Sequence, residues 1–389
     1  MVIVQLADGM LSIGGVSRFI YNLTLKLEKQ TNRAISAVYE LEENNNWGEQ
    51  PLNIIKLDDN NETSYKKISG CNPDLIVWHV SIRTIGLVRE LSKKYPVLAI
   101  VHSIPCPSGT RLFRDKDEIC YITSGAKCLQ NWYTRRCGTN PSPTKAVKSL
   151  LVHKTMMNTL KSCNWVYTIS KSMKSYLMQE GIPEEQITIF DVSLGSVLEL
   201  PKEINIVEKN NDDPIHILFM GRLSYNKGVQ YLIKAVKILL DEGMKVTCTI
   251  AGKGWFESKL VQLTEELNLS HTIAFIGSVP GTDVGKWYEA ADVIVVPSIL
   301  PEPAGLVVPE ARSYGKPVVV FNVGGLAEWN EYITGISNAE APDPYSLART
   351  IKQTMKKEEV PQVKMNYADE RVDIVDQIGK VLISNQAAK

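Results

Sequence analysis

The sequence predicts an α/β protein with two doubly wound parallel sheets that follow one another along the chain. Three observations support this prediction. The chain has 389 residues, of which 44% are hydrophobic, and such a length suits two domains better than one core. Short runs rich in Val and Ile alternate with helical patterns, as expected of parallel sheets covered on both faces. A polar stretch at residues 201–214 interrupts this alternation and is expected to be a linker.

The first half, residues 1–200, is expected to form one Rossmann-like domain. Its four apolar runs lie at residues 3–6, 75–78, 97–101 and 166–169. Their length and their content of β-branched residues favour buried strands. The first run lacks a basic region and a long hydrophobic stretch, so we expect a strand there and not a signal peptide.

The second half, residues 215–370, repeats the pattern. Five further runs lie at residues 215–220, 246–250, 272–276, 293–296 and 318–321. Between the first two of them, apolar residues recur at helical spacing, which predicts an amphipathic helix. Two such sheets are expected to face a central cleft, a natural place for a ligand. Residues 371–389 are expected to form a C-terminal helix that packs back on the first domain.

The totals exclude some classes of function. Lys plus Arg equals 43, as does Asp plus Glu, so the net charge is +0 and no global basic field indicates a nucleic acid partner. No run of about eighteen apolar residues predicts a membrane span. The seven cysteines are an odd number and come without an export signal, so a reducing cytoplasm is the expected location.

The loop after the run 215–220 carries two cations between glycines. Gly221 and Arg222 follow the strand, and Lys227 and Gly228 precede the helix. Cations at the carboxyl end of a parallel strand, beside a helix N-terminus, are typical of a site for a diphosphate. Arg can fork two phosphate oxygens and Lys adds a point charge. The alternative is a solvated loop with two ordinary surface cations.

The next strand end carries Gly252 and Gly254. Small residues there would let the backbone approach a ligand, although a plain tight turn explains them equally well.

Two carboxylates follow the run 293–296. Glu302 is expected on the loop, and Glu310 in the first turns of the next helix, where Pro309 is tolerated. One carboxylate can accept hydrogen bonds from a sugar and the other from a ribose diol, while the helix N-terminus faces the phosphates. The alternative is that the helix dipole alone favours both residues. Downstream, a Gly-Gly pair precedes Glu328 and either contacts the same ligand or forms a turn.

Taken together, these motifs resemble the retaining glycosyltransferases of family 4, which have the GT-B fold with two Rossmann-like domains. The resemblance is densest over residues 215–330 and rests on Gly221-Arg222, Lys227-Gly228, Glu302 with Glu310, Gly315-Lys316-Pro317-Val318, and Gly324-Gly325 with Glu328.

The resemblance implies a role for each residue of the second half. Arg222 and Lys227 would bind the diphosphate of the donor. Glu302 would hold the hydroxyls of the donor sugar, and Glu310 would hold the ribose. The backbone amides of Gly305 and Leu306 would face the sugar and the phosphate.

The first half supplies three further candidates. Gly14 and Gly15 do not form a dinucleotide fingerprint; the resemblance implies that their backbone reaches the donor phosphate, and helix capping is the alternative. His102 ends the run 97–101, at the edge of the sheet where ligands bind. A lone His is usually structural, but the resemblance implies that His102 sits by the reacting sugar. His79, at the end of the run 75–78, is expected to be structural.

Three segments are less regular. Four cysteines lie close together in the sequence, at Cys106, Cys120, Cys128 and Cys137. They could bind zinc, form disulfides or remain unbound thiols. The absence of a C-x-x-C pair weakens the zinc alternative. Residues 145–161 form a basic amphipathic pattern that fits an anionic acceptor, a membrane surface or simply a solvated helix face. Asp191-Val192-Ser193 stands where the family often has Asn-Gly-Val.

We therefore expect a retaining glycosyltransferase that moves a hexose or N-acetylhexosamine from a nucleotide diphosphate sugar to an acceptor hydroxyl of a saccharide or small natural product. UDP-sugars are the favoured donors and GDP-sugars the next. The two cations can stabilise the leaving group without a metal, so we expect no cofactor to be required for catalysis. Two alternatives remain open, a GT-B sugar-nucleotide 2-epimerase and a non-catalytic sugar-nucleotide-binding protein.

Overall fold

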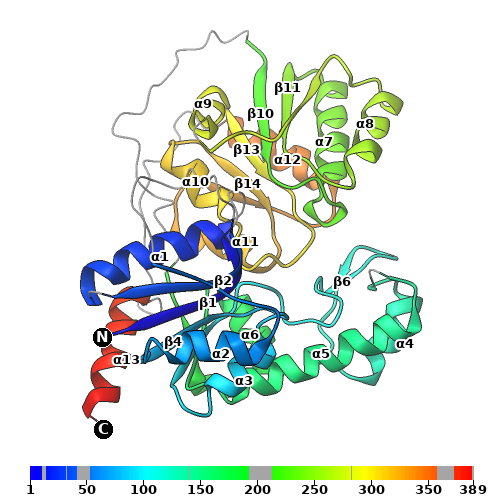
Figure 1. The fold of residues 1–389 in the computed structure, drawn as a ribbon. Coiled ribbons are helices and arrows are strands. Elements are labelled where there is room, and N and C mark those ends of the chain that lie inside the picture. Colours follow the sequence, from blue (N-terminus) through cyan, green and yellow to red (C-terminus); the bar gives the residue numbers. More distant parts are fainter. Residues whose placement is uncertain are drawn as a thin grey trace. The chain divides into compact units, whose positions relative to one another are not determined.

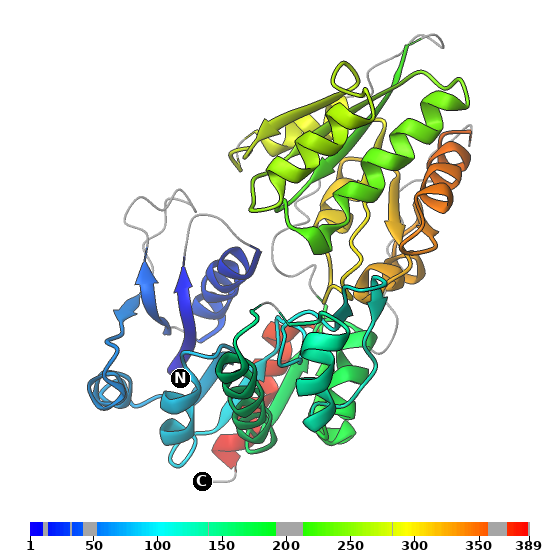
Figure 2. The same cartoon turned by 90° about the vertical axis from the view of Figure 1, so that its right-hand side faces the viewer.

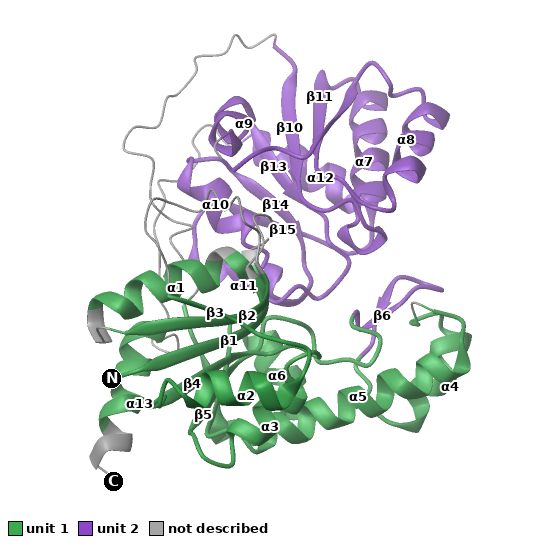
Figure 3. Ribbon diagram, in the orientation of Figure 1, with its two compact units in different colours: residues 1–109, 121–196, 369–389 green, residues 110–120, 197–368 purple. Residues whose placement is uncertain are grey.

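The computed structural model of the chain describes residues 1–10, 15–31, 33–41, 53–138, 140–191, 213–281, 283–356 and 372–387. The chain divides into two compact units (Figure 3). Unit 1 comprises Met1–Gly109, Tyr121–Ser196 and Asp369–Lys389, and unit 2 comprises Thr110–Cys120 and Val197–Ala368. Residues 110–120 lie within the predicted first domain, whereas the structure groups them with the second unit. Residues 201–212 of the predicted linker lie outside the described residues.

Unit 1 contains a seven-stranded parallel sheet in the order β3-β2-β1-β4-β5-β8-β9. The strands are β1 (Ile3–Met10), β2 (Ala34–Leu41), β3 (Ile54–Lys56), β4 (Leu75–His79), β5 (Val97–Ile100), β8 (Trp165–Thr168) and β9 (Ile187–Ile189). Every residue of β4 and of β5 is buried, as expected of central strands that are covered on both faces.

The helices of unit 1 connect these strands (Figure 1). They are α1 (Gly15–Thr31), α2 (Asn61–Ser69), α3 (Ile85–Leu91), α4 (Ala126–Thr134), α5 (Pro143–Lys161), α6 (Lys171–Gln179) and α13 (Ile374–Ala387), with the 3-10 turn η1 (Glu184–Gln186). Helix α13 comes from the end of the chain and contacts α1. A parallel bridge between Phe190 and Val372 accompanies this contact.

Unit 2 contains a six-stranded parallel sheet in the order β12-β11-β10-β13-β14-β15. The strands are β10 (Ile215–Met220), β11 (Val246–Ala251), β12 (Ile273–Gly277), β13 (Val293–Val296), β14 (Val318–Phe321) and β15 (Ile336–Ala339). The order reverses beside β10, because β11 lies on one side of it and β13 on the other. Such a switch point is where open α/β sheets bind ligands.

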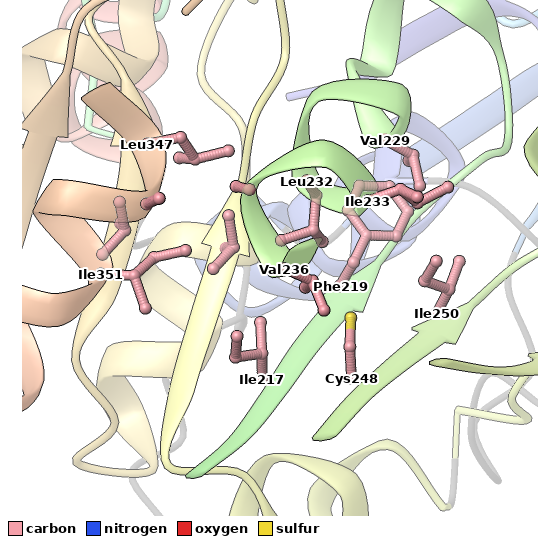
Figure 4. Close-up of a cluster of buried hydrophobic side chains, with 14 of the residues drawn as sticks. Ile217, Phe219, Val229, Leu232, Ile233, Val236, Cys248, Ile250, Leu347 and Ile351 are labelled. Carbon is pink, nitrogen blue, oxygen red and sulfur yellow. The ribbon is translucent and has the colours of Figure 1, made fainter. Parts of the chain in front are cut away.

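The helices of unit 2 cover both faces of this sheet. They are α7 (Val229–Asp241), α8 (Glu257–Glu266), α9 (Val284–Ala290), α10 (Val307–Ser313), α11 (Gly324–Tyr332) and α12 (Pro344–Met355), with the 3-10 turn η3 (Tyr225–Lys227). Helices α7 and α12 lie side by side (Figure 2). Their apolar residues meet those of β10 and β11 in a core that includes Ile217, Phe219, Leu232, Val236 and Leu347 (Figure 4). In β13 and β14 the alternate residues are buried as well, so the opposite face is also covered.

A two-stranded antiparallel hairpin, β6 (Leu112–Phe113) with β7 (Glu118–Ile119), makes up the early part of unit 2. Leu112 is fully buried in the core described above, and Ile119 packs against it. This apolar anchor is the physical reason that the segment belongs to unit 2. Within the residues that the structure describes, no helix is both long enough and apolar enough to span a membrane.

Candidate functional site

The loop after β10 is held in place by its backbone. Leu223 donates its N–H to the carbonyl oxygen of Lys253, in the loop after β11, at a distance of 2.9 Å. The 3-10 turn Tyr225–Lys227 follows directly. Arg222 and Lys227 therefore lie on a loop that is fixed to its neighbour at the carboxyl edge of the sheet.

The same loop is also fixed to the segment after β13. Ser298 Oγ and the N–H of Ile299 both donate to the carbonyl oxygen of Asn226, at 3.0 and 3.1 Å. Gly228 closes this contact, because it has a φ of 70° and a Cβ there would lie 1.7 Å from the carbonyl oxygen of Pro297. Three strand ends are thus joined through one loop, whose conformation depends on a glycine.

The other glycines of this edge are explained by the protein itself. A Cβ on Gly252 would lie 1.8 Å from the carbonyl oxygen of Gly221, and one on Gly254 would lie 2.0 Å from that of Leu223. Close packing between loops requires these glycines whether or not a ligand approaches them.

Lys227 and Glu302 form an ion pair across this edge. Lys227 Nζ lies 2.6 Å from Glu302 Oε1. The Lys227 side chain is 23% exposed and that of Glu302 is 10% exposed, so the pair is shielded from water but open on one side. The two residues are far apart in sequence and meet because β10 and β13 are neighbours. The ammonium has three donors and can keep this contact while it binds an anion.

Arg222 differs from Lys227 in its surroundings. Its side chain is exposed, and among the described residues no carboxylate forms an ion pair with it. A guanidinium in this state can offer its planar fork to two phosphate oxygens at once.

The loop that carries Glu302 is supported by the start of α11. Gly325 donates its N–H to the carbonyl oxygen of Glu302 at 2.8 Å, and the indole nitrogen of Trp329 donates to the carbonyl oxygen of Ala304. Gly305 packs against α11 as well, since a Cβ on it would lie 2.2 Å from Leu326 Cδ2. The Gly324-Gly325 segment, expected either to contact a ligand or to form a turn, packs against the loop that carries Glu302.

Glu310 lies in the first turn of α10, which follows Leu306. Its carboxylate Oε2 accepts a hydrogen bond from the hydroxyl of Tyr288 at 3.1 Å. The ring of Tyr288 stacks on that of Tyr314 with a centroid distance of 5.3 Å, so the hydroxyl is held by packing.

In unit 1, His102 ends a chain of buried polar side chains. His102 Nε2 lies 2.9 Å from His79 Nδ1, and His79 Nε2 lies 2.9 Å from the amide oxygen of Gln5. The amide nitrogen of Gln5 donates to Thr24 Oγ1 at 2.6 Å, and Thr24 Oγ1 donates to the carbonyl oxygen of Ile20 at 2.7 Å. The two imidazoles are stacked at an interplanar angle of 14°.

This network assigns the tautomers of both imidazoles. Because Gln5 presents its oxygen, His79 carries its proton on Nε2 and accepts at Nδ1. His102 must then donate from Nε2, and its Nδ1 is left as a lone-pair acceptor. Burial lowers the pKa of His102 to about 4. Burial and the neighbouring imidazole hold the pKa of His79 well below its usual value, so both rings are neutral near pH 7.

These lowered pKa values predict an acid-sensitive fold. The unfolded chain takes up protons on both imidazoles near pH 6.5, whereas the native state does not, so the free energy of unfolding should fall as the pH drops from about 6.5 to about 4. The slope is at most about 1.4 kcal/mol per pH unit for each histidine. Urea unfolding at a series of pH values measures it, and His102→Gln should flatten the curve. The exposed His271, replaced in the same way, is the control; equal slopes in all three proteins would contradict the assignment.

The remaining sequence-predicted residues give no site of their own. Gly14 lies outside the described residues, and Gly15 begins α1. None of the seven cysteines forms a disulfide. In the described part of the chain, no three His, Cys, Asp or Glu side chains are grouped so that they could hold a metal ion. In the structure, Cys106, Cys120, Cys128 and Cys137 are therefore grouped neither as metal ligands nor in disulfides.

Sequence reasoning missed two residues that support these groups. Tyr288 holds Glu310, and Gln5 orients the histidine pair. A polar Gln in the middle of an apolar strand is a usable signal, because a buried amide must find partners. Tyr288 has no such signal, since an aromatic residue on a helix is usually part of a core.

Comparison with known proteins identifies the family to which the chain is similar. The model of the family described as glycosyl transferases group 1 matches residues 201–371. An uncharacterized glycosyltransferase of Methanocaldococcus jannaschii is 36% identical over 294 residues, which are 68% of this chain and 70% of that protein. A 2-deoxystreptamine glucosyltransferase of Streptomyces kanamyceticus is 31% identical over 137 residues, 35% of each chain.

Solved structures share the fold at low identity. Anabaena HepE in complex with UDP-glucose matches 100% of this chain and 99% of its own, with 17% identity and a TM-score of 0.67. Sucrose-phosphate synthase of Thermosynechococcus elongatus matches 100% of this chain and 99% of its own, with 18% identity and a TM-score of 0.70.

These likenesses define the class of protein as a glycosyltransferase, and the solved structures confirm the predicted GT-B fold with two Rossmann-like domains. The relative that aligns along most of its own length narrows this further. The chain belongs to the group 1 glycosyltransferases.

Proposed function

We propose that this glycosyltransferase is a retaining enzyme of family 4 that moves a hexose or N-acetylhexosamine from a nucleotide diphosphate sugar to an acceptor hydroxyl. The observation that carries this proposal is the shielded Lys227–Glu302 ion pair, with the exposed Arg222 on the same loop, at the switch point of the unit 2 sheet. It brings together cations suited to a diphosphate and a carboxylate suited to sugar hydroxyls. UDP is the favoured nucleotide, since HepE with the same fold was solved with UDP-glucose, and GDP is the next choice.

Four side chains bind different parts of the nucleotide sugar. Arg222 and Lys227 bind the diphosphate. One N–H of the Lys227 ammonium donates to Glu302, and the other two donate to the diphosphate. Glu302 accepts hydrogen bonds from hydroxyls of the sugar. Glu310, whose carboxylate accepts a hydrogen bond from Tyr288, also accepts hydrogen bonds from the ribose diol.

Backbone groups complete the proposed donor site. The amides of Gly305 and Leu306 face the sugar and phosphate, and the chain at Gly221, Gly252 and Gly254 approaches the nucleotide. Gly14 and Gly15 of unit 1 are proposed to reach the donor phosphate in the same way.

The chemistry follows from charge that develops on the leaving group. As the bond from the anomeric carbon to the phosphate oxygen breaks, negative charge grows on the nucleotide diphosphate, and Arg222 and Lys227 stabilise it electrostatically. The departing phosphate oxygen accepts the proton of the acceptor hydroxyl, whose oxygen bonds to the anomeric carbon from the same face. His102 positions the sugar, since its Nδ1 lone pair can accept a hydrogen bond from a sugar hydroxyl. The acceptor is a saccharide or a small natural product, and the reducing cytoplasm is the proposed location.

A thermal-shift screen of UDP-glucose, UDP-galactose, UDP-N-acetylglucosamine, GDP-mannose and free UDP tests this proposal. A donor present at about a hundred times its dissociation constant should stabilise the folded state by about 2.7 kcal/mol. The binder is then incubated with water as the acceptor, and proton NMR follows the first anomer of the released sugar. A retaining enzyme gives the α anomer first from an α-linked donor. If none of the nucleotide sugars stabilises the protein, the proposal that it uses a nucleotide sugar donor is wrong. If the β anomer appears first, the proposal that the enzyme is retaining is wrong.

A further inference from the structure

The hairpin Thr110–Cys120 (called here the Asp117 hairpin) lies in the first half of the sequence, yet it belongs to unit 2. The chain passes from unit 1 into unit 2 after Gly109 and returns before Tyr121, as the change of colour in Figure 3 shows. The hairpin is anchored by Leu112, which is fully buried in the unit 2 core. A short hairpin is not stable by itself, so its structure depends on what it docks against.

The carboxylate of Asp117 connects the hairpin to two tyrosines. Both oxygens of Asp117 lie 2.8 Å from the hydroxyl of Tyr225, and Oδ2 also accepts a hydrogen bond from the hydroxyl of Tyr231. Burial first, and then the Asp117 carboxylate, raise the pKa of both tyrosines. Both hydroxyls therefore keep their protons and act as donors to a charged acceptor, which is the strong kind of hydrogen bond.

One of these tyrosines belongs to the loop after β10 that carries Arg222 and Lys227 (the Lys227 loop). Tyr225 is the first residue of the 3-10 turn that ends at Lys227, and its carbonyl oxygen accepts the N–H of Gly228 at 3.2 Å. Its ring is also held edge-on by Phe256. Tyr231 lies further along, in α7. The carboxylate thus fixes the start of the turn on one side and the helix after it on the other.

We propose that Asp117 is a positioning residue for the nucleotide sugar, which acts through Tyr225 to hold the turn that presents Lys227 to the diphosphate. This inference rests on the proposed function of the Lys227 loop. It follows that binding of the donor and docking of the Asp117 hairpin stabilise each other, because coupling between two sites is reciprocal. The hairpin begins soon after His102 in the chain, so a segment of the first half takes part in donor binding.

Three conservative variants test this. Asp117→Asn keeps a residue that tolerates the φ of 54° at this position and removes the charge. Tyr225→Phe and Tyr231→Phe each remove one hydroxyl and keep the ring. Calorimetric titration with UDP-glucose should give a dissociation constant about tenfold weaker for Asp117→Asn and for Tyr225→Phe, which is about 1.4 kcal/mol. In donor hydrolysis KM should rise by the same factor, with kcat changed less than about threefold.

Two comparisons separate positioning from general stability. The double variant Asp117→Asn/Tyr225→Phe should bind about tenfold and not about a hundredfold more weakly, because both changes break the same contact. Tyr231→Phe should weaken binding less than Tyr225→Phe, although each removes one hydroxyl from the same carboxylate. Lys116→Gln, which replaces an exposed charged residue on the same hairpin, is the control for loss of charge. Equal effects of the two tyrosine variants, or unchanged binding in Asp117→Asn, would overturn the proposal.

A measurement without ligand keeps this test separate from that of the proposed function. The Lys227 amide donates to the carbonyl oxygen of Ser224 at 2.9 Å. Hydrogen exchange of this amide and of the Gly228 amide should be faster in the double variant than in the wild type. Unchanged exchange would overturn the role of the hairpin in holding the turn, whatever the protein binds. If no nucleotide sugar binds the wild-type protein, the proposed function fails, and with it the link from hairpin to donor; faster exchange would then still show that Asp117 orders the turn.

Discussion

Replacing Lys227 by Ala should lower the rate of sugar transfer or donor hydrolysis at least about tenfold. The variant loses a charge-assisted contact to the diphosphate, and it also leaves Glu302, whose side chain is 10% exposed, without its cation and close to an anionic ligand. Both effects act on the same step, since charge grows on the diphosphate as the glycosidic bond breaks. Steady-state kinetics with UDP-glucose, or with the donor found by the screen, gives kcat and KM for the comparison.

Three further variants sharpen this result. Arg222→Ala should also lower turnover at least about tenfold, because its guanidinium has phosphate as its proposed partner. Lys227→Ala combined with Glu302→Gln should be less impaired than the two single losses multiplied, since the residues contact each other. Lys237→Ala is the matched control, for that lysine pairs with Asp241 on the exposed side of α7. Near-normal turnover in both Lys227→Ala and Arg222→Ala would remove the diphosphate role.

Gly228→Ala should destabilise the protein by about 2–5 kcal/mol. A left-handed backbone conformation costs a residue other than glycine about 1–2 kcal/mol, and forcing extra atoms into a close-packed site costs typically 1–3 kcal/mol more. Here the added carbon would lie 1.7 Å from the carbonyl oxygen of Pro297, so the loops after β10 and β13 must separate. The midpoint of urea unfolding, followed by circular dichroism, measures the loss.

Gly243→Ala provides a matched control for this variant. Gly243 has a similar φ of 80°, but a Cβ there would meet nothing within 4 Å. It should therefore show only the backbone cost, about 1–2 kcal/mol. If the two variants lose the same stability, the loops after β10 and β13 separate without cost. The close contact between Gly228 and the carbonyl oxygen of Pro297 then contributes nothing to stability.

The sequence predicted the central strands better than those at the edges. Strands such as β10 and β13 are apolar runs because both of their faces are buried, and they were found close to their observed bounds. Strand β15 (Ile336–Ala339) reads Ile-Ser-Asn-Ala and is mostly half-buried, and β3 has three residues. Edge strands of this kind bury too little surface to need an apolar run, so the predicted sheets lacked them. The predicted sheets also lacked β9, a mostly buried edge strand, and β2, a mostly buried strand between β3 and β1, which low burial does not explain.

The candidate site shows a similar division. Lys227 and Glu302 could each be selected from their places after apolar strands, because chain order fixes which residues stand at a strand end. Their direct contact could not, since it depends on β10 and β13 being neighbours in the sheet. Asp117 gave no signal at all. It lies in a polar turn, and its partners Tyr225 and Tyr231 are more than a hundred positions away.

The helix at the end of the chain has a consequence for how the protein is made. Domains generally fold as units while the nascent chain leaves the ribosome, but unit 1 includes residues 369–389. Ile374 and Ile378 of α13 are fully buried, and α13 contacts α1, so the surface that receives α13 stays uncovered until residues 374–387 have been synthesised. Unit 1 is thus begun before unit 2 and completed after it, and removal of residues 374–387 should expose the surface of α1 that α13 contacts.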